Sequence, residues 1–395
     1  MQNLTQLRLK DLWKEVKSED DLWEDLKQES KEYLKMLIEG CLLEDQSRSL
    51  NMPRYSRKKP RLDYRNGYYK RDIESSMGLI KDVLVPRNRI TPYEISLFKK
   101  YRRKEVKLIE LIKDAFLSGL STRKVGEVLE GILGYKISAS TVSNIAKTLD
   151  SKVREFHTKS IEDKYAYLFL DGINLNVKCI NTRNKKTILA AYGITEQGDR
   201  ELISFRIEKS ESELSCYLFV DSLFRRGLKG KKLNLVVVDG SASLKLAVKT
   251  VYPFTPFQRC WVHKLRNVAV KLPKKGAEDC LAAAKKIYLA GGRKEAVKVY
   301  SKWVEVFKDK YPKAVECLSK DIEDLLTFFD FPQNIRVKIR TTNIIERSFR
   351  EVGRRTRPIG CFENEASVNR IIFGVMSGLN KNWKSKPLKE FTQKT

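Results

Sequence analysis

Two apolar runs, each followed by Asp-Gly, stand out in the pattern of hydrophobic and polar positions along the chain. Tyr165–Leu170 precedes Asp171, and Leu233–Val238 precedes Asp239. Both runs are apolar, rich in β-branched or aromatic residues and stopped by Gly, so they predict short buried strands. Between them, three further strands are predicted at Ile173–Ile180, Thr187–Ile194 and Glu201–Ile207, and a helix at Ser212–Arg225. A second helix, Ala242–Val251, is predicted after Asp239.

Apolar positions three and four apart predict helices in the rest of the chain. Residues 101–150 should form three helices, separated by Gly119-Leu120-Ser121, with Ser121 as a cap, and by Gly134-Tyr135. Tight turns between such helices are typical of a helix-turn-helix, but a small helical bundle of another function fits equally well. Residues 1–50 also read as amphipathic helices, which could pack on a second subunit, on a basic face or in an ordinary core.

The charge balance changes this picture, because a chain of 395 residues with a net charge of +28 and a pI near 9.7 should bind a polyanion. A hydrophobic content of 42% indicates globular domains, from two to four of them. Nucleic acid is the first expectation. The rival, a membrane surface, is disfavoured because we find no apolar run of about 18 residues, no lipidation motif and no signal-peptide core. A cytoplasmic protein is therefore expected.

Basic and polar side chains gather at two places where DNA contact is predicted. Residues 51–104 carry 16 basic and 5 acidic side chains, and the cations alternate with tyrosines, as expected for phosphate and base contacts. A solvated charge run is the alternative. The predicted DNA-binding residues here, and at the start of the third helix of residues 101–150, are Arg54, Arg57, Lys58, Lys59, Arg61, Arg65, Ser140, Thr141, Ser143, Asn144 and Lys147.

Three carboxylates suggest the chemistry. Asp171 and Asp239 each follow a predicted strand, and Glu346 lies on the amphipathic helix predicted for residues 341–355. Aspartates at the ends of neighbouring strands, joined by a Glu from a helix on the same sheet, would form an all-oxygen pocket suited to Mg²⁺, for which Mn²⁺ can substitute. Two such ions can support in-line displacement at phosphorus, so we predict a site for two ions that cleaves or transfers phosphodiesters.

Each acid also has a simpler interpretation. Asp171-Gly172 is typical of a hairpin turn, and Asp239 could cap the helix that follows it. Asn343 and Glu346 have the spacing of a capping box. Cys260 and His263 could form half of a zinc site, but with two His in the chain and no second close pair a structural Zn²⁺ is not expected.

The sequence also resembles a known family, the bacterial insertion-sequence transposases of the Mutator-like type, which carry an Asp-Asp-Glu catalytic triad. The residues that carry the resemblance run in order along the chain, from Arg65-Asn-Gly-Tyr68 and Val85-Pro-Arg87, through Gly119–Arg123, Leu170-Asp171-Gly172, Val238-Asp239-Gly240 and Gln258–Asn267 with Cys260 and His263, to Thr342–Arg347 and Arg354–Gly360.

The resemblance implies an α/β chain in which a ribonuclease-H-like catalytic domain is interrupted by an α-helical insertion and preceded by helical DNA-binding domains. The predicted boundaries are 1–50 for an N-terminal helical segment that could mediate oligomerisation, 51–104 for a basic DNA-binding segment, 105–155 for a helix-turn-helix, 160–258 and 336–395 for the two parts of the catalytic domain, and 259–335 for the insertion. A long insertion is needed because residues 240–345 exceed a strand-helix-strand crossover, which takes some tens of residues.

The resemblance further implies a transposase that binds terminal inverted repeats, frees 3′-OH ends and joins them to target DNA by metal-dependent transesterification, as a homodimer or larger synaptic complex. Asp171, Asp239 and Glu346 would be the catalytic metal ligands. Further DNA contacts are predicted at His263, Arg266, Arg347, Arg350, Arg354, Arg355 and Arg357. Two alternatives remain: a structure-selective nuclease of the same fold, and a DNA-binding regulator without catalysis.

Overall fold

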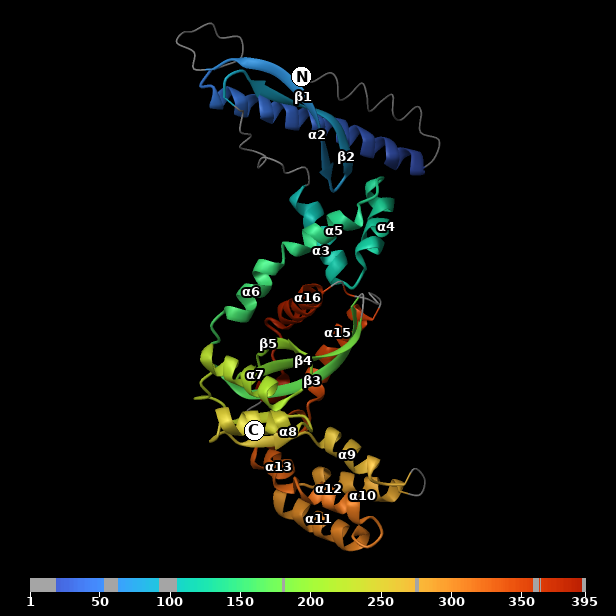
Figure 1. Ribbon diagram of the computed structural model, residues 1–395, viewed down its shortest axis with the longest axis vertical. Coiled ribbons are helices and arrows are strands. Elements are labelled where there is room, and N and C mark those ends of the chain that lie inside the picture. Colours follow the sequence, from blue (N-terminus) through green and yellow to red (C-terminus); the bar gives the residue numbers. More distant parts are fainter. Residues whose placement is uncertain are drawn as a thin grey trace. The chain divides into compact units, whose positions relative to one another are not determined.

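The computed structural model describes residues 19–52, 63–91, 105–179, 182–273, 277–357, 362 and 364–392. The chain forms two compact units (Figure 1). One contains residues 1–116 and 120–147, and the other contains residues 117–119 and 148–395.

The first unit joins one long helix to a β-hairpin and a group of three helices. Helix α2 (Glu19–Ser49) packs on strand β2 (Gly78–Asn88), which pairs antiparallel with β1 (Arg65–Ser75). Leu42 of α2 is fully buried against Ile73, Ile80, Val83 and Val85 of the hairpin. Ordinary core packing, one of the roles left open for residues 1–50, is therefore the one observed for this face of α2. The hairpin was missed because charged residues are frequent in β1 and interrupt the aliphatic run of β2.

The three helices predicted between residues 101 and 150 are confirmed. They are α3 (Val106–Leu117), α4 (Thr122–Leu133) and α5 (Ala139–Lys147). The Ser121 hydroxyl accepts a hydrogen bond from the Lys124 N–H at 3.2 Å, and Gly134 ends α4 with φ +71°, the left-handed conformation that glycine adopts without cost. Gly126 lets α4 approach the segment before α5, because a Cβ there would stand 2.2 Å from the Ile137 carbonyl oxygen.

The second unit is built on a five-stranded sheet in the order β5-β4-β3-β6-β7. Strands β3 (Tyr165–Cys179), β4 (Thr182–Thr195) and β5 (Arg200–Glu208) form an antiparallel meander. Strands β6 (Leu235–Val238) and β7 (Phe257–Arg259) run parallel to β3. The two predicted runs on either side of Gly172 are one continuous strand, because Asp171 and Gly172 both pair with β4, so the prediction that Gly stops the first run was wrong.

Helices cover both faces of the sheet, as the alternation of its side chains requires. Leu168 and Leu170 of β3 point to the face where α7 (Glu213–Arg225) and α8 (Ala242–Val251) pack. On the other face Tyr192 of β4 meets Trp383 of α16 (Glu365–Trp383) edge to face, with ring centroids 5.6 Å apart. Helix α15 (Asn343–Thr356) contacts β3 and α16, and α6 (Asp150–Thr158) joins them through Arg370 of α16, which pairs with Asp150 at 2.6 Å.

The segment between β7 and α15 is helical, as predicted. It comprises α9 (Trp261–Val270), α10 (Glu278–Leu289), α11 (Arg293–Phe307), α12 (Pro312–Ser319), α13 (Ile322–Leu326), the 3₁₀ helix η1 (Thr327–Asp330) and α14 (Gln333–Ile339), and a short helix α17 (Lys389–Thr392) lies near the end of the chain. The fully buried Gln258 fastens this helical segment to the sheet, because its amide donates to the Leu325 carbonyl at 3.1 Å and accepts from the Phe328 N–H at 2.7 Å.

Gly193 of β4 provides a test of the packing beside the sheet. A Cβ there would stand 2.4 Å from the Tyr165 ring and 2.6 Å from the Ile203 side chain. We expect Gly193→Ala to lower the free energy of unfolding by about 1–3 kcal/mol, the usual cost of overpacking a core. Gly378→Ala in α16, where nothing lies within 4 Å of the added carbon, should instead add about 0.5–1 kcal/mol. Urea unfolding of both variants measures the difference, and equal effects would contradict this account.

Candidate metal centre

Asp171 and Asp239 lie side by side because of the register of two parallel strands. Leu170 of β3 pairs with Val238 of β6, so the next residue on each strand is an aspartate. Asp171 is 3% exposed and accepts a hydrogen bond from the Gly172 N–H at 2.9 Å. Asp239 accepts one from the Ser241 N–H at 2.9 Å. The two acids, far apart in sequence, therefore face a common position at the edge of the sheet.

Both carboxyl groups resist ionisation in this position. Burial, and then the charge of Asp239, hold the pKa of Asp171 well above its usual value, and Glu346 adds to the effect. Burial likewise raises the pKa of Asp239 to about 6, although the Ser241 N–H works in the opposite direction. Two adjacent buried carboxylates repel each other unless a proton or a cation lies between them. The site therefore favours a bound positive charge.

Glu346 approaches this pair from helix α15. Its carboxylate oxygen lies 3.4 Å from the Thr342 hydroxyl and 3.8 Å from Nε2 of His263. The apolar stripe of Ile345, Phe349 and Val352 buries one face of α15, which turns the Glu346 face toward the site. Within the part of the chain that the structure describes, no three His, Cys, Asp or Glu side chains are arranged to hold one metal ion as they stand.

Cys260 and His263 support the Glu346 helix through Thr342. The fully buried Thr342 donates its backbone N–H to the Cys260 sulfur at 3.3 Å, and its hydroxyl lies 3.4 Å from Nδ1 of His263. Arg266 contacts the other ring nitrogen at 3.3 Å. Cys260 and His263 therefore form part of the local structure that positions the Glu346 helix. Burial lowers the pKa of His263, although the charge of Glu346 opposes that effect.

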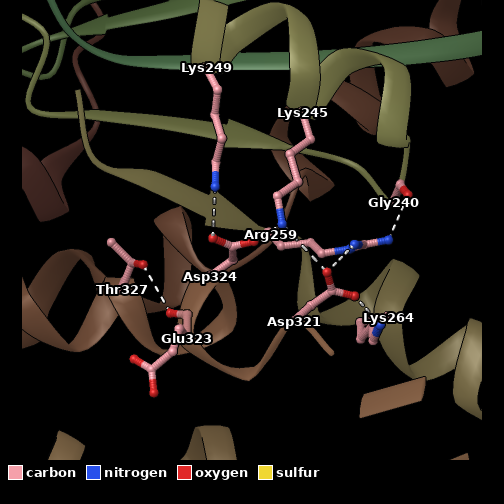
Figure 2. A network of polar contacts seen from close by, with 9 residues as sticks. All are labelled: Gly240, Lys245, Lys249, Arg259, Lys264, Asp321, Glu323, Asp324 and Thr327. Atoms are coloured by element: carbon pink, nitrogen blue, oxygen red, sulfur yellow. Dashed lines mark hydrogen bonds and ion pairs between the residues drawn. The ribbon is translucent and has the colours of Figure 1, made fainter. Parts of the chain in front are cut away.

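A buried ionic network fixes the turn after Asp239 (Figure 2). Arg259 of β7 donates one guanidinium N–H to the Gly240 carbonyl at 2.7 Å and pairs with Asp321 at 2.7 Å. Asp321 also pairs with Lys264 of α9, and Lys245 of α8 pairs with Asp324 of α13. Burial alone would raise the pKa of Asp321, but its cationic partners lower it overall. The helical segment is thus bound electrostatically to the loop that carries Asp239.

The simpler roles considered for the three acids were wrong. Asp171 lies inside a long strand and not in a hairpin turn. Helix α8 is capped by Ser241, whose hydroxyl accepts from the Leu244 N–H. Helix α15 begins at Asn343 with no side-chain hydrogen bond at its cap, so the capping box is absent there.

The predicted DNA-binding residues fall into three groups. Ser140, Asn144 and Lys147 are exposed on α5, whereas Val142, Ile145 and Ala146 are buried behind them. Thr141 and Ser143 are half-buried at the edge of the same face. The structure also shows Arg65 on β1, where its guanidinium donates to the Ser47 hydroxyl and the Met52 carbonyl. Arg54, Arg57, Lys58, Lys59 and Arg61 lie outside the described residues.

The predicted cations beside Glu346 are mostly exposed. Arg347, Arg350, Arg354 and Arg357 of α15 and its end project into solvent, as does Arg266 of α9. Arg355 is half-buried and pairs with Glu351 at 2.5 Å, so its charge is partly neutralised by that carboxylate. His157 packs against Phe205 with ring centroids 4.7 Å apart.

Sequence reasoning missed the roles of five residues around the site: Glu211, Arg259, Lys264, Asp321 and Thr342. Arg259 and Lys264 lie inside the family pattern at residues 258–267, which could have indicated them. Glu211 and Asp321 come from segments with no motif, so only the fold brings them near the aspartates.

Comparisons with known proteins identify the class and then the family. The chain is 32% identical over 353 residues to the transposase for insertion sequence element ISRM5 of Rhizobium meliloti, covering 89% of this chain and 88% of that protein. It is also 32% identical over 357 residues, and 90% of each chain, to the transposase for insertion sequence element IS256 in transposon Tn4001 of Staphylococcus aureus. The family model described as Transposase, Mutator family matches residues 3–386. The chain therefore belongs to the Mutator family of transposases.

A similarity among solved structures is much weaker. The Drosophila P element transposase strand transfer complex matches with a TM-score of 0.30 and 11% identity, covering 72% of this chain and 83% of that one. A score this low supports no conclusion about this chain. Across the described ranges, no helix is long and apolar enough to cross a membrane.

The repulsion at the aspartate pair predicts a pH-dependent stability. The pKa of Asp239 is raised in the folded state, so its favourable contribution is complete below about pH 3.8 and is lost as the pH rises through about 6. In EDTA at pH 7.5, the free energy of unfolding of Asp239→Asn should therefore exceed that of wild type by about 2 kcal/mol. The difference should become smaller toward pH 4. Denaturant titration at both pH values checks this.

The control for this experiment is Asp309→Asn, an exposed site on the helical segment, which should change stability little at either pH. An Asp239→Asn protein less stable than wild type at pH 7.5 would contradict the electrostatic account.

Proposed function

We propose that this transposase cleaves DNA at the terminal inverted repeats of its element and joins the freed 3′-OH ends to target DNA, with Asp171, Asp239 and Glu346 as the catalytic carboxylates. The observation that carries the proposal is the pairing of β3 with β6, which brings the buried Asp171 and the half-buried Asp239 together beside the Glu346 helix. The relatives are named as transposases of insertion sequences, which supports a mobile DNA element as the substrate.

The sheet order supports a ribonuclease-H-like catalytic domain. Three antiparallel strands followed by two parallel ones, in the order β5-β4-β3-β6-β7, are the arrangement typical of that fold, with helices on both faces. The helices from α9 to α14 then form an insertion between the second aspartate and the Glu346 helix.

The acids fit a divalent cation by their chemistry. The donor set is all oxygen. Asp171 is buried and Asp239 is half-buried, and the pKa of each is raised by an environment that favours a neighbouring positive charge. Asp171, Asp239 and Glu346 would hold Mg²⁺, or Mn²⁺ in its place, at two positions. When bound, such ions activate an attacking oxygen and stabilise the leaving oxygen at phosphorus.

The protein's own groups orient these ligands. The Gly172 and Ser241 N–H groups each fix one aspartate oxygen, and a hydrogen bond links the two carboxyl groups to each other. Thr342 and His263 hold the Glu346 carboxylate, and Arg259 fixes the Gly240 carbonyl of the Asp239 turn. These contacts restrain the ligand side chains before a cation binds.

DNA contacts would come from α5 and from the cationic side of α15. The exposed Ser140, Asn144 and Lys147 face of α5 has the composition of a recognition helix in the major groove. Arg347, Arg350 and Arg354 would bind phosphates near Glu346. Cutting two transposon ends together requires a homodimer or a larger synaptic complex, which would act at the bacterial nucleoid.

Two alternatives have different outcomes. A structure-selective nuclease would cut branched DNA but never join a 3′-OH to a new strand, whereas a DNA-binding regulator would bind transposon ends without Mg²⁺-dependent cleavage. A strand-transfer assay on end-sequence duplexes separates all three functions.

We expect Asp171→Asn, Asp239→Asn and Glu346→Gln each to reduce cleavage and strand transfer by at least about 100-fold, because each removes several kcal/mol of charge stabilisation at the reacting phosphate. Binding to end DNA should persist. Gel analysis of cleaved and joined products in Mg²⁺ measures the effect.

Glu196→Gln, in the exposed turn between β4 and β5, is the matched control and should retain wild-type rates. Undiminished cleavage by all three acidic variants would exclude this catalytic site.

The α5 face gives a second prediction, on recognition. Asn144→Ala should weaken binding to terminal inverted repeats by about 1–3 kcal/mol and leave binding to random duplex nearly unchanged. Lys147→Ala should weaken both and reduce the salt slope of binding by about one. Fluorescence anisotropy at several salt concentrations tests both variants, each serving as the other's control. Wild-type affinity and salt slope in both would remove α5 from the interface.

A further inference from the structure

Glu211 is a fourth carboxylate beside the aspartates that no motif assigns. It precedes Ser212, which caps α7, so it lies on the opposite side of the sheet from α15. Its charge contributes to raising the pKa of Asp239, whereas Glu346 has that effect on Asp171. Glu211 is therefore close enough to Asp239 for their charges to interact, as Glu346 is to Asp171.

The Glu211 carboxylate is held against the strand that carries Asp171. A Cβ at Gly172 would stand 3.2 Å from its Oε2 and 3.4 Å from its carboxyl carbon. The absence of a side chain at Gly172 thus leaves room for this approach.

The loop that carries Glu211 is well fixed. The Ser212 hydroxyl accepts from the Ser215 N–H at 3.1 Å, and the Ser215 hydroxyl donates to the Ser210 carbonyl at 3.2 Å. The Ser243 hydroxyl, at the start of α8, donates to the Glu211 carbonyl at 3.5 Å. These contacts tie Glu211 to the segment that follows Asp239.

One oxygen of Glu211 is buried without a partner. Among the described residues, nothing hydrogen-bonds to Oε1, and less than 1 Å² of this atom is exposed. Leaving a charged oxygen buried and unpaired is costly, and natural proteins retain such a group where a ligand, water or ion supplies the missing partner. A neutral partner would not offset the repulsion from Asp239, but a cation would.

We propose that Glu211 is a ligand of one of the two divalent cations, the one on the Asp239 side of the site, while Glu346 serves the other. This inference rests on the proposed metal-dependent function and adds a fourth ligand to its three acids. Each cation position would then have a glutamate of its own, and the buried aspartates between them would be shared.

Mn²⁺ titration of the full-length protein by calorimetry and electron paramagnetic resonance tests the assignment. Glu211→Gln keeps the shape of the side chain but removes its charge. We expect it to weaken binding of one Mn²⁺ by about 10-fold or more, since even groups that only orient metal ligands cost about 10- to 100-fold. Glu211→Asp should recover part of that affinity. Glu213→Gln, exposed on the first turn of α7, is the matched control and should bind Mn²⁺ as wild type does.

Stability without metal separates a ligand from a structural residue. In EDTA, Glu211→Gln should unfold at the same temperature as wild type or at a higher one, because the charge it removes is unpaired. In saturating Mn²⁺ its thermal midpoint should rise less than that of wild type. A lower midpoint in EDTA, or an unchanged Mn²⁺ affinity, would overturn the proposal.

Asp239→Asn distinguishes this inference from the proposed function. If Asp239→Asn loses Mn²⁺ binding and Glu211→Gln does not, the metal centre stands and the assignment of Glu211 fails. If Asp239→Asn binds Mn²⁺ as tightly as wild type, the metal centre itself is wrong.

Discussion

The repulsion between two neighbouring carboxylates is the constraint on which the second unit depends. Asp171 and Asp239 are neighbours because β3 and β6 run parallel in one fixed register, and a slip of one residue would turn each side chain to the other face of the sheet. The hydrophobic core under α7 and α8 holds that register against the electrostatic cost. The fold is thus locally destabilised at the position where a cation is most strongly favoured.

The surrounding polar contacts serve this pair from several elements. Arg259 holds the Gly240 carbonyl and is itself held by Asp321 of the helical segment, so that segment helps to fix the loop after Asp239. Thr342 and His263 restrain Glu346 from the other direction. Buried ion pairs add little net stability, but breaking one leaves an uncompensated charge in the interior. Such a network therefore disfavours other arrangements of these side chains. The helical segment therefore supports the site as well as extending the surface.

Much of the local structure followed from the sequence. The capping Ser121 and the left-handed Gly134 marked the helices of residues 106–147, and the apolar stripe of Ile345, Phe349 and Val352 marked the Glu346 helix. The β1–β2 hairpin was missed because its buried residues are few and its charged ones many. The strand through Asp171-Gly172 was cut in two because Gly usually ends a strand, whereas here pairing with β4 carries the strand past it.

The sequence by itself determined the family and most of the helical and strand-forming segments, and it singled out three acids as candidate ligands, because motifs and periodicity are local properties of the chain. Only the tertiary structure decided which side chains surround those acids. Glu211, Arg259 and Asp321 approach the aspartates through the register of parallel strands and the docking of helices, which depend on packing between segments far apart in sequence. The unpaired Glu211 oxygen could be recognised only in the folded structure, because its burial and its lack of a hydrogen-bond partner depend on the surrounding segments.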